Sequence, residues 1–220
     1  MPNPIVIAHH LIWTAYGWWL PNDPRGSMSH LIASDLIAEL GDLHFGRKTL
    51  QPAGAIIREF YQRAASALKY DLLTFDTPAI RAIADAFAAV IQEQNYTCYA
   101  CAIMPDHIHL IVRKHKHTAE EMIEHFQNAS RSRLRTLGLR AEDHPVRGGP
   151  GWKVFLDHPE EVWRTIRYVE ENPVKIHWAR QVWDLVTPYD NWPLHAGHSP
   201  NSPYAQRLRA VGRYPHDRRH

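Results

Sequence analysis

Two histidines, His107 and His109, lie two residues apart in an otherwise apolar and β-branched stretch. Side chains along a β-strand alternate between its faces, so both imidazoles should point to the same face. The apolar residues that alternate with them should point to the opposite face, where a core can cover them: Ile108, Leu110 and Val112. Two neighbouring imidazoles suit a divalent metal ion or a phosphate group. Two solvated or hydrogen-bonded histidines on a half-buried strand fit the pattern as well, and both interpretations stay open.

A tyrosine and an asparagine share one flank of a predicted helix that begins near residue 159 and stops at Pro173. The apolar stripe of this helix has offsets of four and three residues: Val162, Ile166 and Val169. At about 100° per residue, Tyr168 lies well away from this stripe, and Asn172 falls almost beneath Tyr168 one turn later. The helix therefore presents a phenol hydroxyl and an amide oxygen together, on a flank that does not face the core.

The composition predicts a globular domain with a substantial core, because 45% of the 220 residues are hydrophobic and 22% are charged. No apolar run reaches the roughly 18 residues of a membrane-spanning helix. The N-terminus also lacks the basic and apolar regions of a signal peptide, so we expect a cytoplasmic protein with no membrane partner. A net charge of +2 excludes a surface that binds polyanions all round, and nucleic-acid contacts have to come from local arginine clusters.

Four side chains are candidates for such contacts. Arg131 and Arg133 belong to an arginine cluster on a predicted helix, whereas Trp18 and Arg25 lie where the first predicted strand runs into a turn. Aromatic rings beside an arginine can stack on nucleobases, although packing of the strand end accounts for Trp18 at least as well. For the arginine cluster, the alternative is a solvated helix face.

The two cysteines, Cys98 and Cys101, have the C-x-x-C spacing of a redox pair or of half a zinc site. They lie in a strand-like run, where an offset of three residues places them on opposite faces. The sequence contains no second cysteine pair. Buried free thiols are therefore the favoured interpretation.

The order of the predicted elements indicates the fold class. We expect strands over 5–16, 96–103, 107–113 and 152–156, and helices over 34–40, 56–68, 77–94, 118–137 and 159–172. Thr77 is the expected N-cap of one helix, and Thr118 with Glu121 forms a capping box at the next. This order fits a ferredoxin-like α+β fold, in which an antiparallel sheet of about four or five strands carries its helices mainly on one face.

The domain organisation follows from where this order is interrupted. Residues 1–192 are expected to form a single domain with an insertion or lid at about 27–76, the least readable part of the chain. Residues 193–220 are rich in arginine and histidine and are expected to form a flexible basic tail, for which phosphate contacts are an equal alternative.

Three stretches of the sequence resemble a known family. The Met-Pro-Asp-His-Ile-His-Leu run at 104–110, the Tyr-Val-Glu-Glu-Asn-Pro-Val-Lys run at 168–175 and the aromatic stretch at 13–26 are similar to those of HUH single-strand tyrosine transposases. The closer similarity is to the REP-associated (RAYT) branch, and it covers about residues 5–192 apart from 27–76. Asp106 stands where the family usually has asparagine. This carboxylate either orients a histidine or caps the turn, and we slightly favour the turn.

The resemblance implies a specific chemistry. His107, His109 and Asn172 would hold a Mg²⁺ or Mn²⁺ ion, and Tyr168 would attack the scissile phosphate to form a 5′-phosphotyrosine link that frees a 3′-hydroxyl. The implied partner is single-stranded DNA containing hairpin or repeat elements, and a homodimer with its site in cis or in trans stays open.

Two other functions compete with this interpretation. One is a non-catalytic ferredoxin-like module that binds single-stranded nucleic acid through Arg131, Arg133 and the loop at 18–19. The other is a metal-dependent hydrolase, in which the histidine pair activates water and Tyr168 is structural.

Overall fold

The computed structural model describes residues 6–46 and 48–193. Its elements are, in chain order, β1 (Ala8–Thr14), α1 (Asp35–Ala38), α2 (Gly54–Ala65), α3 (Thr77–Gln94), β2 (Cys98–Ile103), β3 (His107–Arg113), α4 (Ala119–Thr136), β4 (Trp152–Leu156), α5 (Pro159–Glu170) and α6 (Asn172–Lys175). Apart from Pro193, the predicted basic tail lies outside the described residues. Among the described helices, none combines the length and the apolar character needed to span a bilayer.

The four strands form one antiparallel sheet in the order β2-β3-β1-β4. This is the strand order that the ferredoxin-like prediction requires, and the α+β fold class is confirmed. A tight turn joins β2 to β3, where the amide of Met104 donates to the carbonyl of His107 at 2.8 Å. Strand β1 lies between β3 and β4, and Ile12 of β1 pairs with His109 of β3.

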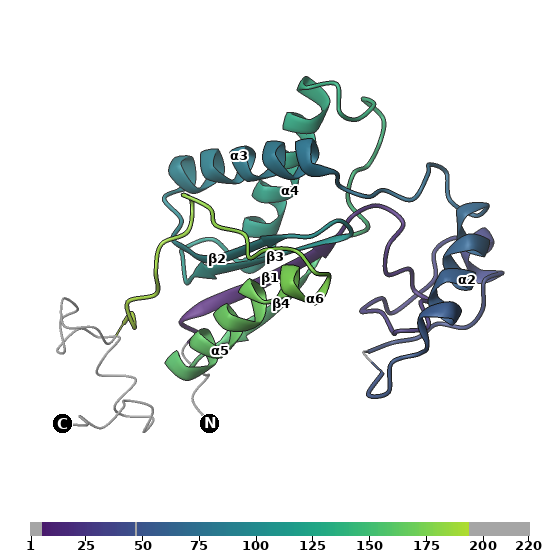
Figure 1. The fold of residues 1–220 in the computed structure, drawn as a ribbon, viewed down its shortest axis with the longest axis horizontal. Helices are drawn as coiled ribbons and strands as arrows, with labels where there is room; N and C mark the ends of the chain where they lie inside the picture. Colours follow the sequence, from purple (N-terminus) through teal and green to yellow (C-terminus); the bar gives the residue numbers. More distant parts are fainter. Residues whose placement is uncertain (1–5, 47, 194–220) are drawn as a thin grey trace.

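Each face of the sheet is covered by a different set of helices (Figure 1). Helices α3 and α4 pack on the face that includes Ile108, Leu110 and Val112, and together they form the larger core cluster. Helix α5 packs on the opposite face against β2 and β3, where its apolar stripe meets a second buried cluster that includes Ile111. The expectation of helices mainly on one face therefore holds for the two longest helices but not for α5. The reason is that both faces of the sheet carry apolar side chains.

The helix caps mostly follow the local sequence signals. Thr118 and Glu121 form the predicted capping box of α4. The N-cap of α3 is Asp76 and not Thr77, because the Asp76 carboxylate accepts the amide of Ala79 at 2.9 Å. Both residue types are good N-caps, and the one-residue shift leaves Pro78 in the first turn.

The prediction that Cys98 and Cys101 face opposite ways is wrong. A β-bulge between Cys98 and Ala100 inserts one extra residue into β2, so an offset of three brings both thiols to the same face. Both are buried in the core cluster beneath α3 and α4, and both are free. Burial raises the pKa of the Cys98 thiol to about 12, which agrees with the expected inert thiols.

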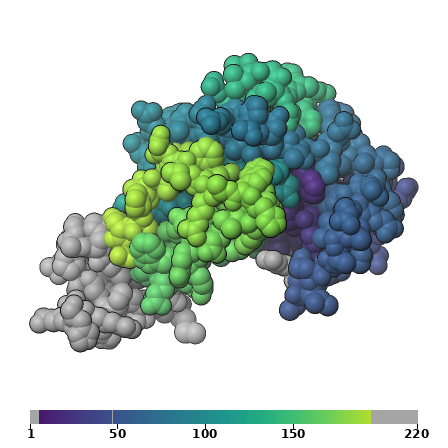
Figure 2. Space-filling model, in the orientation of Figure 1, coloured from purple at the N-terminus to yellow at the C-terminus, as the bar shows by residue number. Residues whose placement is uncertain are grey.

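The predicted insertion at 27–76 forms a small lobe beside the sheet (Figure 1). Phe60, Tyr61 and Ala64 of α2 make its own buried cluster, against which Trp18 and Leu20 pack. The lobe therefore includes the turn that follows β1 as well as the predicted insertion. The space-filling view shows the lobe on one side and α5 with α6 on the other, with N-terminal residues recessed between them (Figure 2).

Candidate active site

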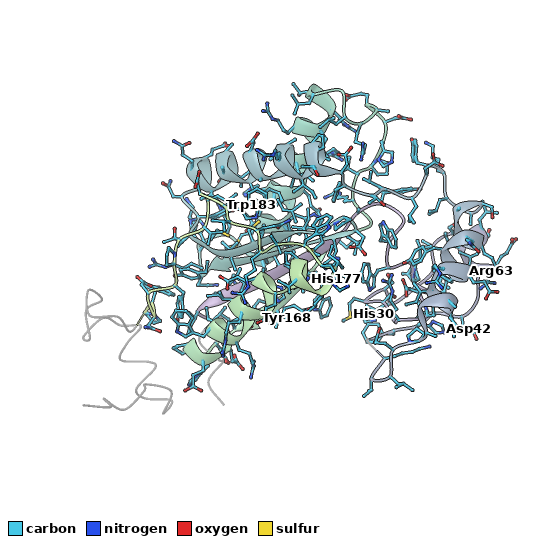
Figure 3. All side chains as sticks on the ribbon, viewed as in Figure 1. His30, Asp42, Arg63, Tyr168, His177 and Trp183 are labelled. Atoms are coloured by element: carbon cyan, nitrogen blue, oxygen red, sulfur yellow. The ribbon has the colours of Figure 1, made fainter. Side chains whose placement is uncertain are left out.

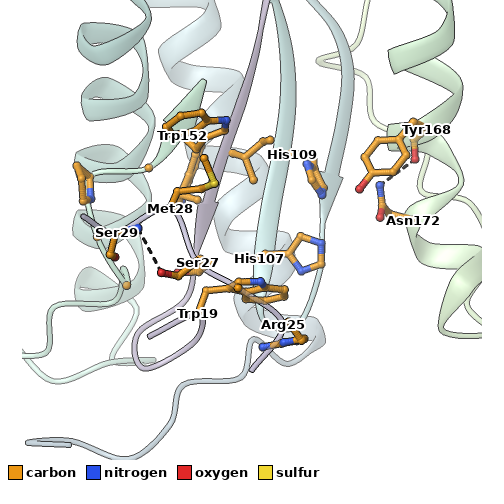
Figure 4. A pocket seen from close by; sticks show the side chains of 18 of the residues that line it. Trp19, Arg25, Ser27, Met28, Ser29, His107, His109, Trp152, Tyr168 and Asn172 are labelled. Atoms are coloured by element: carbon orange, nitrogen blue, oxygen red, sulfur yellow. Dashed lines mark hydrogen bonds between the residues drawn. The ribbon is translucent and has the colours of Figure 1, made fainter. Parts of the chain in front are cut away.

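A cavity of about 530 Å³ opens where the sheet, helices α5 and α6, and the helical lobe meet. His107 and His109 line it from β3, and Tyr168 and Asn172 face them from the opposite wall (Figure 4). Strand β1 also lines the cavity, as do two loops, 25–29 of the lobe and 148–151 before β4. All four residues that the sequence assigned to metal binding and catalysis are thus in one cavity.

Both histidines of the pair are oriented through Nδ1. His107 Nδ1 lies 2.7 Å from a carboxylate oxygen of Asp106, and His109 Nδ1 lies 2.9 Å from Nε2 of His10. In each ring this leaves Nε2 as the nitrogen available to a ligand. The contact of Asp106 favours the orienting role over the turn-capping role that the sequence slightly favoured.

The electrostatics keep the buried imidazoles neutral. Burial, with smaller contributions from His107, His10 and Lys175, holds the pKa of His109 well below its usual range. Burial likewise lowers the pKa of His10 to about 4. A neutral imidazole has a free lone pair, which is the form that binds a metal ion.

On the opposite wall, Tyr168 and Asn172 are held in different ways. The Tyr168 side chain lies on the side of the sheet away from α3 and remains 38% exposed, so substrate can reach it (Figure 3). Asn172 is buried, and its amide nitrogen donates to the carbonyl of Tyr168 at 2.8 Å. Although α5 ends at Glu170 and Asn172 starts α6, this bond preserves the predicted one-turn relation. The amide oxygen of Asn172 is therefore the side-chain atom that remains to accept a hydrogen bond or bind a ligand.

A cation stands beside this pair, at a residue to which the sequence patterns assigned no role. The ammonium of Lys175 lies 4.0 Å from the ring centroid of Tyr168 and 3.4 Å from the amide oxygen of Asn172. Lys175 also lines the cavity. A positive charge over the Tyr168 ring, at the cavity wall, can bind a phosphate oxygen.

The lobe contributes an aromatic wall that is held by a buried ionic network. The guanidinium of Arg25 lies 3.8 Å from the ring centroid of Trp19 and pairs with Asp23 at 2.7 Å. The Tyr61 hydroxyl bonds to both Asp23 and Arg25, and it accepts the amide of Trp19 at 2.9 Å. Trp19 in turn meets the His107 ring edge to face, with centroids 5.4 Å apart.

The four residues proposed to contact DNA lie in different parts of the structure. Arg25 lines the cavity. Trp18 does not, because its indole donates to the carbonyl of Leu73 at 2.7 Å and its ring packs on Tyr61. Arg131 and Arg133 lie on α4, across the sheet from the cavity, and their contribution to DNA binding stays a prediction.

The donor set at the cavity is one that could hold a divalent metal ion. Two imidazole nitrogens and one amide oxygen line the same cavity, and neighbouring groups orient all three side chains. Throughout 6–46 and 48–193, no group of three or more histidine, cysteine or acidic residues is placed to hold a metal ion. His107, His109 and Asn172 would hold such an ion with three protein ligands, and phosphate or water oxygens would have to complete its shell.

Two residues near the chemistry, Lys175 and His10, were given no role by the sequence, and Trp19 entered only as part of the loop at 18–19. Trp19 is adjacent to Trp18, and its left-handed backbone (φ 52°) turns it to the other side of the chain. Lys175 is the last residue of the motif at 168–175. Its three-residue offset from Asn172 could have indicated that the two side chains lie close together. His10 requires knowledge of strand pairing, because nothing local relates it to His109.

The glycine-containing loop at 148–151 provides a test of how closely the wall of the cavity is packed. A Cβ at Gly148 would lie 2.8 Å from the carbonyl oxygen of Ala15 and 3.2 Å from that of Trp18, whereas a Cβ at Gly149 meets nothing within 4 Å. We expect Gly148→Ala to lower the free energy of unfolding by about 1–3 kcal/mol, since backbone atoms have to move. The matched control Gly149→Ala should stay within about 0.5 kcal/mol. Urea denaturation measures both, and equal stabilities would contradict the close approach of Gly148 to these two carbonyl groups.

Among known proteins, the chain shows similarity to solved structures but not to a family model or a curated protein. A solved structure described as a REP-associated tyrosine transposase bound to a REP hairpin superposes with a TM-score of 0.43 and 14% identity, over 98% of this chain and 87% of that one. A candidate transposase from Deinococcus radiodurans R1 gives a TM-score of 0.35 and 12% identity, over 81% of this chain and 96% of that one. Both are described as transposases, but likeness at this level carries no weight for chemistry.

Proposed function

We propose that this protein is a transposase-like enzyme that nicks and rejoins single-stranded DNA through a covalent tyrosine intermediate. One observation carries the proposal: Tyr168 and Asn172 face His107 and His109 across a single cavity, although more than 50 residues separate the two pairs. The resemblance of both motifs to HUH transposases of the REP-associated branch supports it. Hairpin-containing DNA is the substrate that this resemblance implies.

In the proposed reaction, the Tyr168 hydroxyl oxygen attacks the scissile phosphorus. The bond between phosphorus and the 3′-oxygen breaks, the phenol loses its proton, and the departing oxygen gains one to become a 3′-hydroxyl. The downstream strand stays attached to Tyr168 through its 5′-phosphate. Attack by another 3′-hydroxyl on this phosphotyrosine reverses the step and rejoins strands without an external energy source.

The other residues position and neutralise the phosphate. His107, His109 and Asn172 would hold Mg²⁺ or Mn²⁺, which supplies charge neutralisation at the phosphate when bound. Lys175 contributes a second positive charge on the helix side, and Asp106 and His10 orient the two imidazoles. Trp19 and Arg25 form an aromatic and cationic wall against which an unpaired base can stack.

Adduct trapping on labelled oligonucleotides tests the proposal. The wild-type protein is incubated with Mn²⁺ and a pool of single-stranded oligonucleotides, with and without a hairpin stem, each labelled at the 3′ or the 5′ end. We expect the 3′ label to migrate with the protein after denaturation and the 5′ label to appear on a shorter fragment ending in a 3′-hydroxyl. Cleavage without an adduct would indicate the hydrolase, and binding without cleavage would indicate the non-catalytic module.

Lys175 provides a prediction about transition-state charge. Replacing Lys175 with methionine should lower the single-turnover cleavage rate by about 10- to 100-fold, because a cation aimed at the phosphate is lost. Lys175→Arg keeps the charge and should recover most of the rate. Rapid-quench cleavage with saturating protein measures both variants. Equal rates for methionine and arginine would show that the ammonium only packs on Tyr168.

A further inference from the structure

His10 lies directly behind His109, on the side away from the cavity. Its Nε2 is 2.9 Å from Nδ1 of His109, and the ring centroids are 5.0 Å apart with an interplanar angle of 30°. His10 is 6% exposed and does not line the cavity, whereas His109 does. His10 also meets the Tyr168 ring edge to face, with centroids 6.2 Å apart, so it contacts two residues that line the cavity without lining it itself.

The position of His10 is fixed by the sheet. Ile12 pairs with His109, so His10, two residues earlier on the same face of β1, is a diagonal neighbour of His109. Strand β1 is hydrogen-bonded on both sides, to β3 and to β4. A side chain on a strand held from both sides has little freedom to move, so the contact between the rings is part of the fold.

In a hydrogen bond between two neutral imidazoles, one ring donates the proton and the other accepts it. If His109 donates from Nδ1, its Nε2 carries the lone pair and faces the cavity as a base or a metal ligand. If His10 donates instead, the proton of His109 sits on Nε2 and blocks that nitrogen. Only the first direction is compatible with a ligand role for His109.

We propose that His10 is a positioning residue, which accepts the Nδ1 proton of His109 and so holds the Nε2 lone pair of His109 toward the cavity. Asp106 makes the equivalent contact with His107 at 2.7 Å. The two histidines would thus be oriented by different acceptors, a partly buried carboxylate at the turn and a neutral imidazole in the buried sheet. A carboxylate in the place of His10 would have to be desolvated, which an uncharged ring avoids. The metal part of this role rests on the proposed function.

The tautomer can be read without metal or DNA. Long-range ¹H–¹⁵N NMR of the imidazoles in the metal-free protein should show His109 protonated at Nδ1. In His10→Phe, which keeps the ring and removes the acceptor, we expect a mixture of both tautomers. In His10→Gln, whose amide oxygen can accept the same proton, we expect the wild-type tautomer. His109 protonated at Nε2 in the wild-type protein would overturn the proposal, whether or not any variant folds.

Metal binding provides the second readout. Titration with Mn²⁺ alone should show an affinity about 10- to 100-fold weaker for His10→Phe than for the wild type, and near wild-type affinity for His10→Gln. The matched control is His9→Phe, the same substitution one residue earlier on the opposite, equally buried face. It should change neither the tautomer nor the affinity. A folded His10→Phe protein with both wild-type values would also overturn the proposal. Because the tautomer needs no substrate, a protein that never nicks DNA can still confirm this role of His10.

Discussion

Replacing Tyr168 with phenylalanine is expected to abolish covalent capture of DNA and to lower strand cleavage by roughly 10³-fold or more. The substitution removes one oxygen atom from a side chain that is 38% exposed at the cavity, so the fold should be unaffected. Lys175 and Asn172 keep their places, and affinity for single-stranded DNA should change by less than a factor of about three. Gel analysis of 3′-labelled adducts and fluorescence anisotropy with the same oligonucleotide measure the two quantities.

The control for this prediction is Tyr70→Phe. The Tyr70 hydroxyl donates to Asp143 at 2.7 Å on the surface, outside the cavity, and its removal should leave the adduct yield unchanged. Cleavage that survives in Tyr168→Phe while Tyr70→Phe behaves as wild type would eliminate the covalent mechanism. It would favour water as the nucleophile, with Tyr168 as a wall of the cavity.

Replacing His107 with alanine is expected to weaken Mn²⁺ binding by at least about 100-fold. Losing an orienting neighbour alone typically costs 10- to 100-fold in metal affinity, and loss of a ligand should cost no less. His107 is the better test residue of the pair, because its side chain is 19% exposed whereas His109 is almost wholly buried. Cleavage should fall in parallel, and a chelator should remove the wild-type activity until Mn²⁺ is restored. Isothermal titration calorimetry measures the affinity.

A histidine-rich chain needs a matched control, because the sequence contains 16 histidines that can bind metal weakly. His115 suits this purpose, since its ring contacts Tyr96 and His117 outside the cavity. His115→Ala should leave Mn²⁺ affinity and cleavage unchanged. If both alanine variants bind Mn²⁺ like the wild type, the metal assignment is wrong, although Tyr168 could still be a nucleophile.

The competing functions make different demands on this cavity. A binding module without catalysis has no need of an exposed tyrosine with a lysine over its ring, opposite two oriented imidazoles. A water-activating hydrolase would use the histidine pair, but the placement of Tyr168 and Asn172 in the same cavity would be incidental. The two variants above separate these cases, because Tyr168→Phe tests the nucleophile and His107→Ala tests the metal.

Relations between residues a few positions apart followed from the sequence. The two-residue period of a strand places His107 and His109 on one face, and the helical period places Asn172 one turn after Tyr168. The capping box at Thr118 and the limits of β4 (Trp152–Leu156) also agree with the local patterns. Such features depend mainly on backbone geometry over a few residues.

Relations between elements came only from the folded chain. The same alternation that served β3 failed for Cys98 and Cys101, because a bulge changes the period of β2. His10 reaches His109 across 99 residues of sequence through the pairing of β1 with β3, and the lobe delivers Trp19 and Arg25 to the same cavity. Which elements become neighbours depends on how the whole chain buries its apolar surface, a sum over many long-range contacts that no local pattern contains. The sequence therefore predicted the histidine pair on one face of a strand and the shared flank of Tyr168 and Asn172, whereas the meeting of the two pairs, and the second histidine behind the first, are properties of the tertiary structure.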